Sequence, residues 1–533
     1  MPATETRILA DEETHWRVDI ADRLALLVDG AAYFAALARA MERARHSITI
    51  LGWDIRSDLL LEPETSGETL AERFVRLLDA TPGLRIRILI WDWILPYSLD
   101  REILPQWRIA PLHDRLDFVL DDNVPVGGAA HEKVVVIDGT LAFVGGLDLT
   151  AGRWDTPEHD PANPLRRLPH GGRVRPLFHD VMMAISGPAA ASIGELAVRR
   201  WQRATAQRPS LGPADSEAPW PDGLAADMTK RAVAIARIRP AYGGEPAVHE
   251  IRSLYLAAIA AAERLIYIEN QYLTVPAVAR ALARKLESRP ELEVVVITPQ
   301  KCEGPLETAV MDEGRKRFVA TLEAATGERV AVLVPVSHGD AIKVHAKLLI
   351  VDDRFITLGS ANLANRSMGV DSEINLAIEH EATDPVIRGW RRRLLAEHLG
   401  TTPERLAATE EKEDSLIATI AALNDPEAER YCRPLRLDGE PLPHVVEKLV
   451  ELADPPEPII GDQILGPLLP LRDRRRWRRW TGRIAGLGGG VLIAGTLAGP
   501  LDAGVSPWLW VSLGLALIAF WVVAERLWRP GLQ

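Results

Sequence analysis

The sequence predicts an α/β protein of two similar lobes related by a pseudo-twofold axis, with a hydrophobic helical hairpin at the C-terminal end. Three observations predict this fold class. A motif of polar residues occurs twice with identical spacing, helix and strand patterns alternate around each copy, and two long uncharged stretches close the sequence. At 533 residues the chain exceeds the roughly 250 to 300 residues at which single cores stop growing. We therefore expect several domains.

The duplication is clearest in the motif itself. The first copy contains His131-Glu-Lys133, Asp138, Gly145-Gly146 and Asp148, and the second contains His345-Ala-Lys347, Asp352, Gly359-Ser360 and Asn362. The second copy follows the first at an offset of 214 positions, and every internal spacing agrees. A fixed offset between similar segments indicates duplicated structure.

Each copy is preceded by a similar series of elements. The first half predicts a helix at 31–45 and strands at 47–53, 84–91 and 134–137, and the second half predicts a helix at 248–264 and strands at 265–271, 292–298 and 348–351. Continuous apolar runs such as 134–137 are typical of strands that are buried on both faces, which favours sheets covered by helices.

Composition shifts divide the chain into five segments. A run with four prolines separates the two halves, and charged and proline-rich stretches follow the second half. We predict an N-terminal catalytic lobe at 20–204, a linker at 205–228, a C-terminal catalytic lobe at 229–400, an extension at 401–470, and a basic segment with a two-helix membrane anchor at 471–533.

The predicted anchor consists of the uncharged stretches 484–501 and 505–524, each near the ~20 residues that cross a bilayer. Arginines flank both outer ends of this hairpin and are absent from its turn, and the polar start at 1–19 is unlike a secretory signal. The positive-inside rule then places the body of the protein at the cytoplasmic face of the cell membrane. The alternative is a hairpin that lies in the interface or packs on the protein.

Charge and cysteine content exclude other classes. The formal net charge of −12 disfavours sequence-independent binding of nucleic acid. The two cysteines, Cys302 and Cys432, are far apart and form no metal-binding or disulfide pattern, which suits a reducing compartment.

The motif residues indicate phosphodiester chemistry. In each copy the His and Lys are two positions apart at the start of a strand, so both side chains leave the same face and can share a ligand. Two imidazoles and two ammonium groups in one cavity provide a nucleophile, an acid and fixed positive charge. This reaction requires neither a metal nor a cofactor. The third motif residue, Asp138 or Asp352, stands at an odd separation from the His, so we interpret it as structural.

Residues after each motif strand are candidate lining residues. Glycines allow a close approach of the backbone to the site, and short polar side chains alternate with them. We expect Gly145, Gly146, Asp148, Gly359, Ser360 and Asn362 to border the cavity.

At these residues the sequence resembles the phospholipase D superfamily, specifically the branch shared by eukaryotes and some bacteria, over roughly residues 22–400. The strings that carry the resemblance are Gly145-Gly-Leu-Asp-Leu149, Gly152-Arg-Trp-Asp-Thr-Pro-Glu-His159, Ile266-Tyr-Ile-Glu-Asn-Gln-Tyr272, Gly359-Ser-Ala-Asn362 and Asn365-Arg-Ser-Met368.

The resemblance implies a covalent phosphohistidine intermediate. By family pattern His131 is the nucleophile and His345 the acid and base, although the sequence alone does not fix this order. The family also has a carboxylate that orients each motif histidine. Glu373 fits this role for His345, and Asp155 or Asp160 fits it for His131.

Two further pairs have alternative interpretations. His179-Asp180 matches a family segment that borders the site, or is a buried structural pair. Asn270-Gln271 contacts phosphate or caps a strand end.

The resulting hypothesis is a membrane-anchored phospholipase D. It would hydrolyse glycerophospholipids such as phosphatidylcholine or phosphatidylethanolamine to phosphatidic acid and an alcohol, or transfer the phosphatidyl group to another alcohol. Alternatives are a phosphatidyltransferase of the cardiolipin synthase type, a nuclease of the same superfamily and a catalytically silent membrane scaffold. The sequence does not disclose head-group preference or oligomeric state.

Overall fold

A computed structural model describes most of the chain. The described residues are 7–92, 102, 105–125, 127–167, 174–213, 216–302, 305–437 and 454–458. The predicted membrane hairpin at 484–524 and its basic flank lie outside them. Among the described residues, no helix combines the length and the apolar character needed to cross a bilayer.

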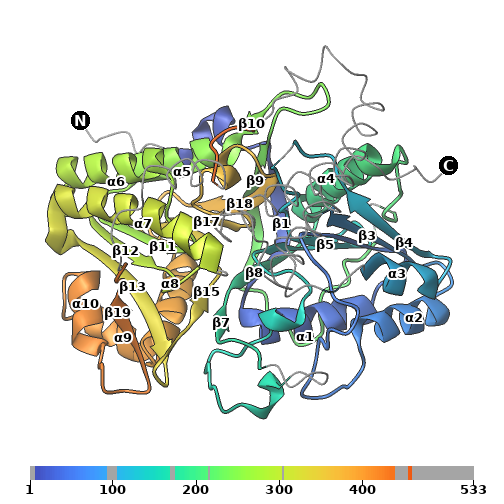
Figure 1. The fold of residues 1–533 in the computed structure, drawn as a ribbon, viewed down its shortest axis with the longest axis horizontal. Helices are drawn as coiled ribbons and strands as arrows, with labels where there is room; N and C mark the ends of the chain where they lie inside the picture. Colours follow the sequence, from blue (N-terminus) through green and yellow to red (C-terminus); the bar gives the residue numbers. More distant parts are fainter. Residues whose placement is uncertain are drawn as a thin grey trace, which may run out of the picture.

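The two halves contain corresponding series of elements (Figure 1). The first half comprises β1 (Arg17–Val28), α1 (Asp29–Glu42), β2 (Ser47–Gly52), α2 (Leu70–Ala80), β3 (Arg85–Trp91), α3 (Pro105–Ile109), β4 (Leu116–Asp121), β5 (Val134–Ile137), β6 (Leu141–Gly145), β7 (Phe178–His179), β8 (Val181–Ser186) and α4 (Pro188–Thr205).

The second half is longer by a few elements. It comprises β9 (Met228–Arg239), β10 (Val248–His249), α5 (Glu250–Ala261), β11 (Leu265–Asn270), α6 (Pro276–Ser288), β12 (Glu293–Ile297), α7 (Pro305–Thr326), β13 (Val330–Ser337), β14 (Asp340–Ala341), β15 (Lys343–Val344), β16 (Lys347–Val351), β17 (Phe355–Gly359), β18 (Glu373–Glu379), α8 (Pro385–His398), α9 (Pro403–Glu410), α10 (Leu416–Leu423) and β19 (Arg430–Pro434). The strands and helices predicted around both motifs are confirmed to within a few residues.

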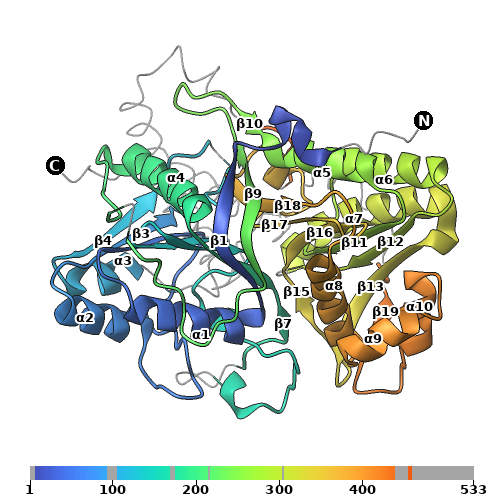
Figure 2. The same ribbon diagram turned by 180° about the vertical axis from the view of Figure 1, so that it is seen from behind.

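The strand pairings repeat between the halves. The first half has the order β4-β3-β2-β5-β6-β8-β1, and the second has β13-β12-β11-β16-β17-β18-β9. Antiparallel pairing of β1 with β9 joins the two series into one large sheet. Figures 1 and 2 show the halves on opposite sides of the molecule, with β1 and β9 together at its centre. The order is the one expected of a duplicated mixed α/β unit.

The predicted extension at 401–470 also contributes to this sheet. Strand β19 pairs with β13, so the sheet of the second half continues to Pro434.

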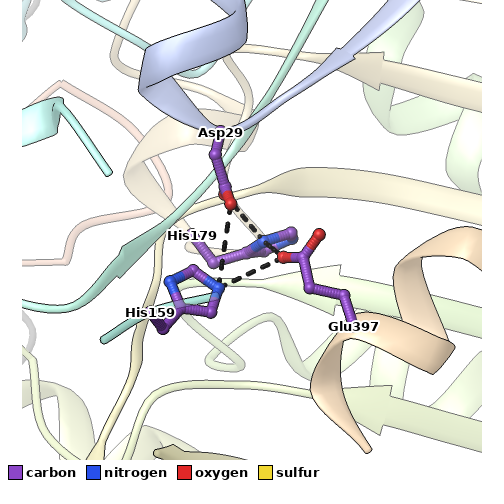
Figure 3. Close-up of side chains that lie close together, drawn as sticks. All are labelled: Asp29, His159, His179 and Glu397. Carbon is purple, nitrogen blue, oxygen red and sulfur yellow. Dashed lines mark hydrogen bonds and ion pairs between the residues drawn. The ribbon is translucent and has the colours of Figure 1, made fainter. Parts of the chain in front are cut away.

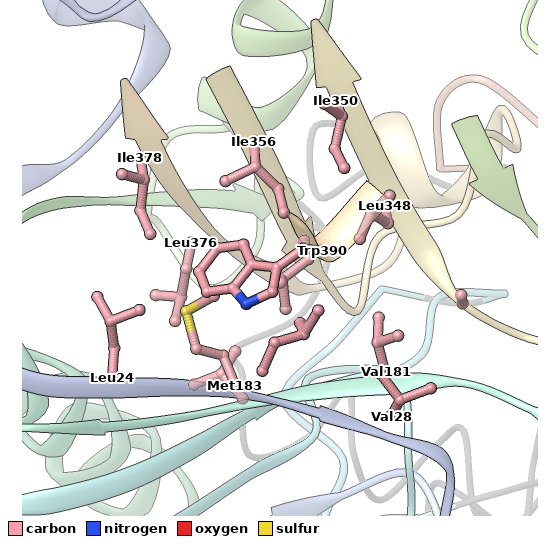
Figure 4. Close-up of a cluster of buried hydrophobic side chains, with 14 of the residues drawn as sticks. Leu24, Val28, Val181, Met183, Leu348, Ile350, Ile356, Leu376, Ile378 and Trp390 are labelled. Carbon is pink, nitrogen blue, oxygen red and sulfur yellow. The ribbon is translucent and has the colours of Figure 1, made fainter. Parts of the chain in front are cut away.

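The three largest hydrophobic clusters of the described residues stabilise each half and the contact between the halves. One lies between the sheet of the first half and α1 and α2, a second lies between the sheet of the second half and α5 to α7, and a third lies between the halves. In this third cluster, Leu24 and Met183 from the first half face Leu376 and Trp390 from the second (Figure 4). Because the two halves bury apolar side chains against each other, their facing sheet ends are fixed in position.

The third motif residues are structural. Asp138 and Asp352 both adopt φ of +51° in the turn after their strands. The Asp138 carboxylate accepts backbone N–H groups of residues 45–47, and Asp352 accepts those of residues 263–265. Neither carboxylate contacts a motif histidine in the described hydrogen bonds. They tie the turn to the start of the neighbouring strand, which agrees with their interpretation as structural members of the motif and not as reacting groups.

We expect Asp138→Ala to lower the free energy of unfolding by about 2 to 3 kcal/mol, because it leaves three partly buried N–H groups without an acceptor. Urea unfolding of the full chain measures this loss. Asp79→Ala is the control, since its side chain is 69% exposed. Equal stability of the two variants would contradict the structural role of Asp138.

Candidate active site

Both motif histidines lie where the two halves meet. The backbone N–H of His131 donates to the carbonyl oxygen of Ser372 at 3.0 Å, across the halves. The backbone N–H of His345 donates to the carbonyl oxygen of His179 at 2.8 Å, next to the parallel pairing of β15 with β7. Each motif is thus held by the backbone of the opposite half.

The carboxylates that orient the histidines are exchanged between the halves. Nδ1 of His131 lies 2.9 Å from both carboxylate oxygens of Glu373, which begins β18. Nδ1 of His345 lies 2.7 Å from Oδ2 of Asp180, which precedes β8. In both cases Nδ1–H can donate to the carboxylate, which leaves the Nε2 lone pair available for chemistry.

This arrangement overturns the expected pairings. Glu373 was expected at His345 and instead contacts His131. Asp155 was expected at His131 and instead lies 2.9 Å from Nδ1 of His159, while also pairing with Arg166. The Asp160 carboxylate accepts the backbone N–H of Ala162.

The sequence indicated Asp180 only as part of a pair that borders the site, without its role at His345. Asp180 and Glu373 occupy equivalent places, each at the start of the strand that follows the motif hairpin. Their separation of 193 residues differs from the repeat offset of 214, because the connection from β6 to β8 is longer than that from β17 to β18. Because each carboxylate was expected to orient the histidine of its own half, the sequence did not indicate the exchange.

The two motif lysines are buried and held by polar neighbours. Nζ of Lys133 lies 3.1 Å from Oδ2 of Asp148 and donates to the carbonyl oxygen of His131 at 3.0 Å. Nζ of Lys347 donates to Oε1 of Gln271 at 3.1 Å and to the carbonyl oxygen of His345. Both ammonium groups therefore have fixed positions beside the imidazole of their own motif.

A salt-bridge network links the first motif to the second half. Arg200 on α4 donates to Glu132 at 3.0 Å and to the Ser372 hydroxyl at 2.7 Å, and it also pairs with Asp121. The hydroxyl of Ser372 donates to Glu132 at 2.7 Å. Since Glu132 stands between the motif His and Lys, this network positions both. Sequence reasoning missed Arg200, because only the fold brings it to the motif.

The predicted lining glycines serve packing rather than an approach to ligand. A Cβ at Gly145 would collide with the carbonyl oxygen of Val181, and a Cβ at Gly359 with that of Ile374. A Cβ at Gly146 would collide with the Asp180 carboxylate. These positions require glycine because the neighbouring strand and its carboxylate lie against them.

The polar lining residues differ in their contacts. The Ser360 hydroxyl donates to Glu373 at 2.5 Å, and Asp148 accepts the backbone N–H groups of residues 53 and 54. Asn362 is buried, and its Oδ1 has no hydrogen-bond partner among the described residues. Asn270 accepts the N–H of Leu363 at 2.9 Å, which supports its strand-capping interpretation.

Two family models match the chain, one around each motif. The model described as "Phospholipase D" matches residues 128–219, and the model described as "Cardiolipin synthase, PLD-like domain" matches residues 255–393. Both motif regions of the chain are therefore similar to the phospholipase D superfamily.

Relatives within this superfamily include Phospholipase D A of Dictyostelium discoideum, which is 25% identical over 71% of this chain and 36% of its own length. Phospholipase D alpha 4 of Arabidopsis thaliana is 24% identical over 75% of this chain and 66% of its own length. The chain thus spans between about a third and two thirds of the length of these two relatives.

A solved structure supports the phospholipase D-like fold. The phosphatidylserine synthase of Haemophilus influenzae superposes with a TM-score of 0.52 at 13% identity, over 79% of this chain and 99% of that one. This likeness concerns the fold alone.

The electrostatic surroundings of His131 and His345 favour the neutral imidazoles. Burial and the Lys133 ammonium hold the pKa of His131 well below its usual value. Burial, Lys347 and Arg153 do the same to the pKa of His345. Each imidazole is also affected by the lysine of the opposite motif, which indicates that all four groups share one electrostatic environment.

The pKa values of the two orienting carboxylates and of one motif lysine are shifted as well. Burial raises the pKa of Asp180 to about 7, and burial and Asp371 raise that of Glu373 well above its usual value. Burial lowers the pKa of Lys347 to about 7. Clusters of titratable groups with shifted pKa values are typical of active sites.

We expect both motif imidazoles to be neutral at pH 6.5, where an unperturbed histidine is half protonated. Their lowered pKa values mean that they bind a proton only at a more acidic pH. Spectra of ¹⁵N-histidine-labelled protein, assigned with His131→Ala and His345→Ala, measure this directly. A doubly protonated ring at either position at pH 6.5 would show that the site is wrongly described.

Proposed function

We propose that this protein is a phospholipase D, which cleaves the head group from glycerophospholipids through a phosphohistidine intermediate. The observation that carries the proposal is the pair of motif imidazoles, each held through Nδ1 by a carboxylate of the opposite half. The curated relatives named phospholipase D support the choice of reaction.

The first step forms a phosphorus–nitrogen bond. With Nδ1–H donated to Glu373, Nε2 of His131 carries the lone pair that attacks phosphorus. The bond from phosphorus to the head-group oxygen breaks, and His345 gives that oxygen a proton. The bound phosphodiester anion favours the protonated form of His345, which makes this acid available at the time of reaction.

The second step restores the enzyme. Neutral His345 takes a proton from water, whose oxygen attacks phosphorus, and the phosphorus–nitrogen bond to His131 breaks. Phosphatidic acid then leaves. Lys133 supplies positive charge for the equatorial oxygens in both steps, and the bound anion favours the charged form of Lys347, which then adds to it. Removing such a donor typically costs about 10²- to 10³-fold in rate.

A phosphatidyltransferase of the cardiolipin synthase type is the second candidate. The match of residues 255–393 to a cardiolipin synthase domain favours it. The same intermediate serves both reactions, and only the acceptor differs, with an alcohol in place of water. The acceptor therefore decides between the two.

We expect the purified protein to convert phosphatidylcholine, phosphatidylethanolamine or phosphatidylglycerol in mixed micelles with ethanol to phosphatidic acid and phosphatidylethanol. His131→Ala and His345→Ala should each abolish both products, because each removes one of the two reacting imidazoles. His249→Ala, at an exposed position on β10, is the matched control. Mass spectrometry of the lipids reads all products.

The other outcomes of this assay are equally informative. Cardiolipin as the main product from phosphatidylglycerol would establish the transferase. No lipid product, together with cleavage of DNA, would contradict the lipid substrate and favour a superfamily nuclease.

We also propose that residues 471–533 attach the protein to the cytoplasmic face of the cell membrane. The apolar stretches 484–501 and 505–524 and the flanking arginines support this. The chain shortened after residue 470 should remain in the supernatant when membranes are sedimented, whereas the full chain should sediment and resist alkaline extraction. Alkaline release of the full chain would contradict a membrane span.

A further inference from the structure

A cluster of four buried side chains lies next to His345 and takes no part in the proposed reaction. Asp29 at the start of α1, His159, His179 on β7 and Glu397 on α8 each direct one ligand atom to a common point, and these atoms lie within 4.8 Å of one another (Figure 3). Three of these residues belong to the first half and Glu397 to the second. All four are buried.

The spacing of these atoms suits a small cation. Oε1 of Glu397 lies 3.2 Å from Nε2 of His159 and 2.7 Å from Nδ1 of His179. The Asp29 carboxylate lies 3.0 Å from Nδ1 of His179 and 3.8 Å from Nε2 of His159. Ligand atoms about 2.0 to 2.1 Å from a tetrahedral zinc ion are separated by roughly 3.3 Å, which falls within this spread.

The outward nitrogen of each histidine is held by another carboxylate. Nδ1 of His159 lies 2.9 Å from Asp155, and Nε2 of His179 lies 2.8 Å from Glu269. If each outward nitrogen carries the proton, each inward nitrogen presents a lone pair to the cluster centre. Metal-binding histidines almost always donate their second ring N–H to a carboxylate, a backbone carbonyl or water, and the carboxylate version is the one present at this cluster.

An unsatisfied atom points independently to a ligand. Oδ2 of Asp29 is buried and has no hydrogen-bond partner among the described residues. Nε2 of His159 lies 3.8 Å from this oxygen, beyond hydrogen-bond distance. A buried carboxylate oxygen without a hydrogen bond is costly and often indicates an ion or water that completes the site. Asp29 also adopts φ of +66°, a left-handed conformation that is uncommon outside glycine, and its side chain points at the two histidines (Figure 3).

We propose that Asp29, His159, His179 and Glu397 bind one divalent transition-metal cation, for which zinc fits best. Two imidazole nitrogens and two carboxylate oxygens favour zinc over calcium or magnesium, which prefer sites made of oxygen alone. The metal is structural, since no residue of the cluster faces phosphate in the proposed reaction. It ties α8 of the second half to β7 of the first.

This tie bears on the active site through the chain itself. His179 immediately precedes Asp180, the carboxylate that orients His345, and its own carbonyl oxygen holds the backbone of His345. A cation at the cluster therefore fixes the segment that positions the second motif. The expectation that no metal is needed concerned the reaction, and this site lies outside it.

The test begins with the metal content of the untagged full-length protein after dialysis against EDTA. We expect about one zinc ion per chain in the wild type. His159→Gln and Glu397→Gln should lower this content at least tenfold, and Asp155→Asn should weaken zinc affinity about 10- to 100-fold. His249→Gln is the control, because this histidine is exposed on β10 and lies outside the cluster.

A second measurement covers the case in which the variants do not fold. Wild-type protein unfolded in EDTA and refolded with Co²⁺ should show the visible d–d absorption of a tetrahedral site, and one equivalent of Zn²⁺ should remove it. Wild-type protein that contains no metal as isolated and gives no such absorption would overturn the proposal. The cluster would then be a hydrogen-bonded network of imidazolium and carboxylate groups. Equal metal content in the wild type and both ligand variants would also overturn it.

Discussion

The exchanged pairing of imidazole and carboxylate between the halves is the interaction on which the rest of the site depends. His131 takes its carboxylate from Glu373, and His345 takes its carboxylate from Asp180. An Nδ1–H bond to a carboxylate fixes both the orientation and the tautomer of an imidazole. Neither half can therefore orient its motif histidine alone, and the proposed reaction requires the two halves to be held in one geometry.

Several features of the fold serve this requirement. Pairing of β1 with β9 joins the sheets at the centre, and the apolar cluster between the halves resists their separation. Closer to the histidines, Arg200 fixes Glu132 against Ser372, and the pairing of β7 with β15 fixes His345. The glycine at position 146 leaves room for the Asp180 carboxylate. Buried polar groups thus form hydrogen bonds across the interface, which makes the relative placement of the two halves specific as well as stable.

The sequence predicted the features that depend on local pattern. The apolar run 134–137, its counterpart 348–351 and the repeat offset were sufficient to predict a duplicated α/β unit with a His and Lys from each half. The partners of the histidines were not predictable in this way, because Glu373 and His131 are brought together only by the packing of one half on the other. A motif shows only the side chains of one strand, whereas the exchange depends on how the two halves pack. The unequal connections before β8 and β18 also concealed that Asp180 and Glu373 are equivalent. The same reason explains why Asp155 was assigned to the wrong histidine.

The most direct test of this account measures which carboxylate each histidine senses. Glu373→Gln and Asp180→Asn would be compared by the ¹⁵N signals of the two motif imidazoles in labelled protein. The account predicts that Glu373→Gln mainly shifts the signals of His131 and that Asp180→Asn mainly shifts those of His345. If Glu373→Gln instead shifted His345 and left His131 unchanged, each half would complete its own site and the exchanged pairing would be contradicted.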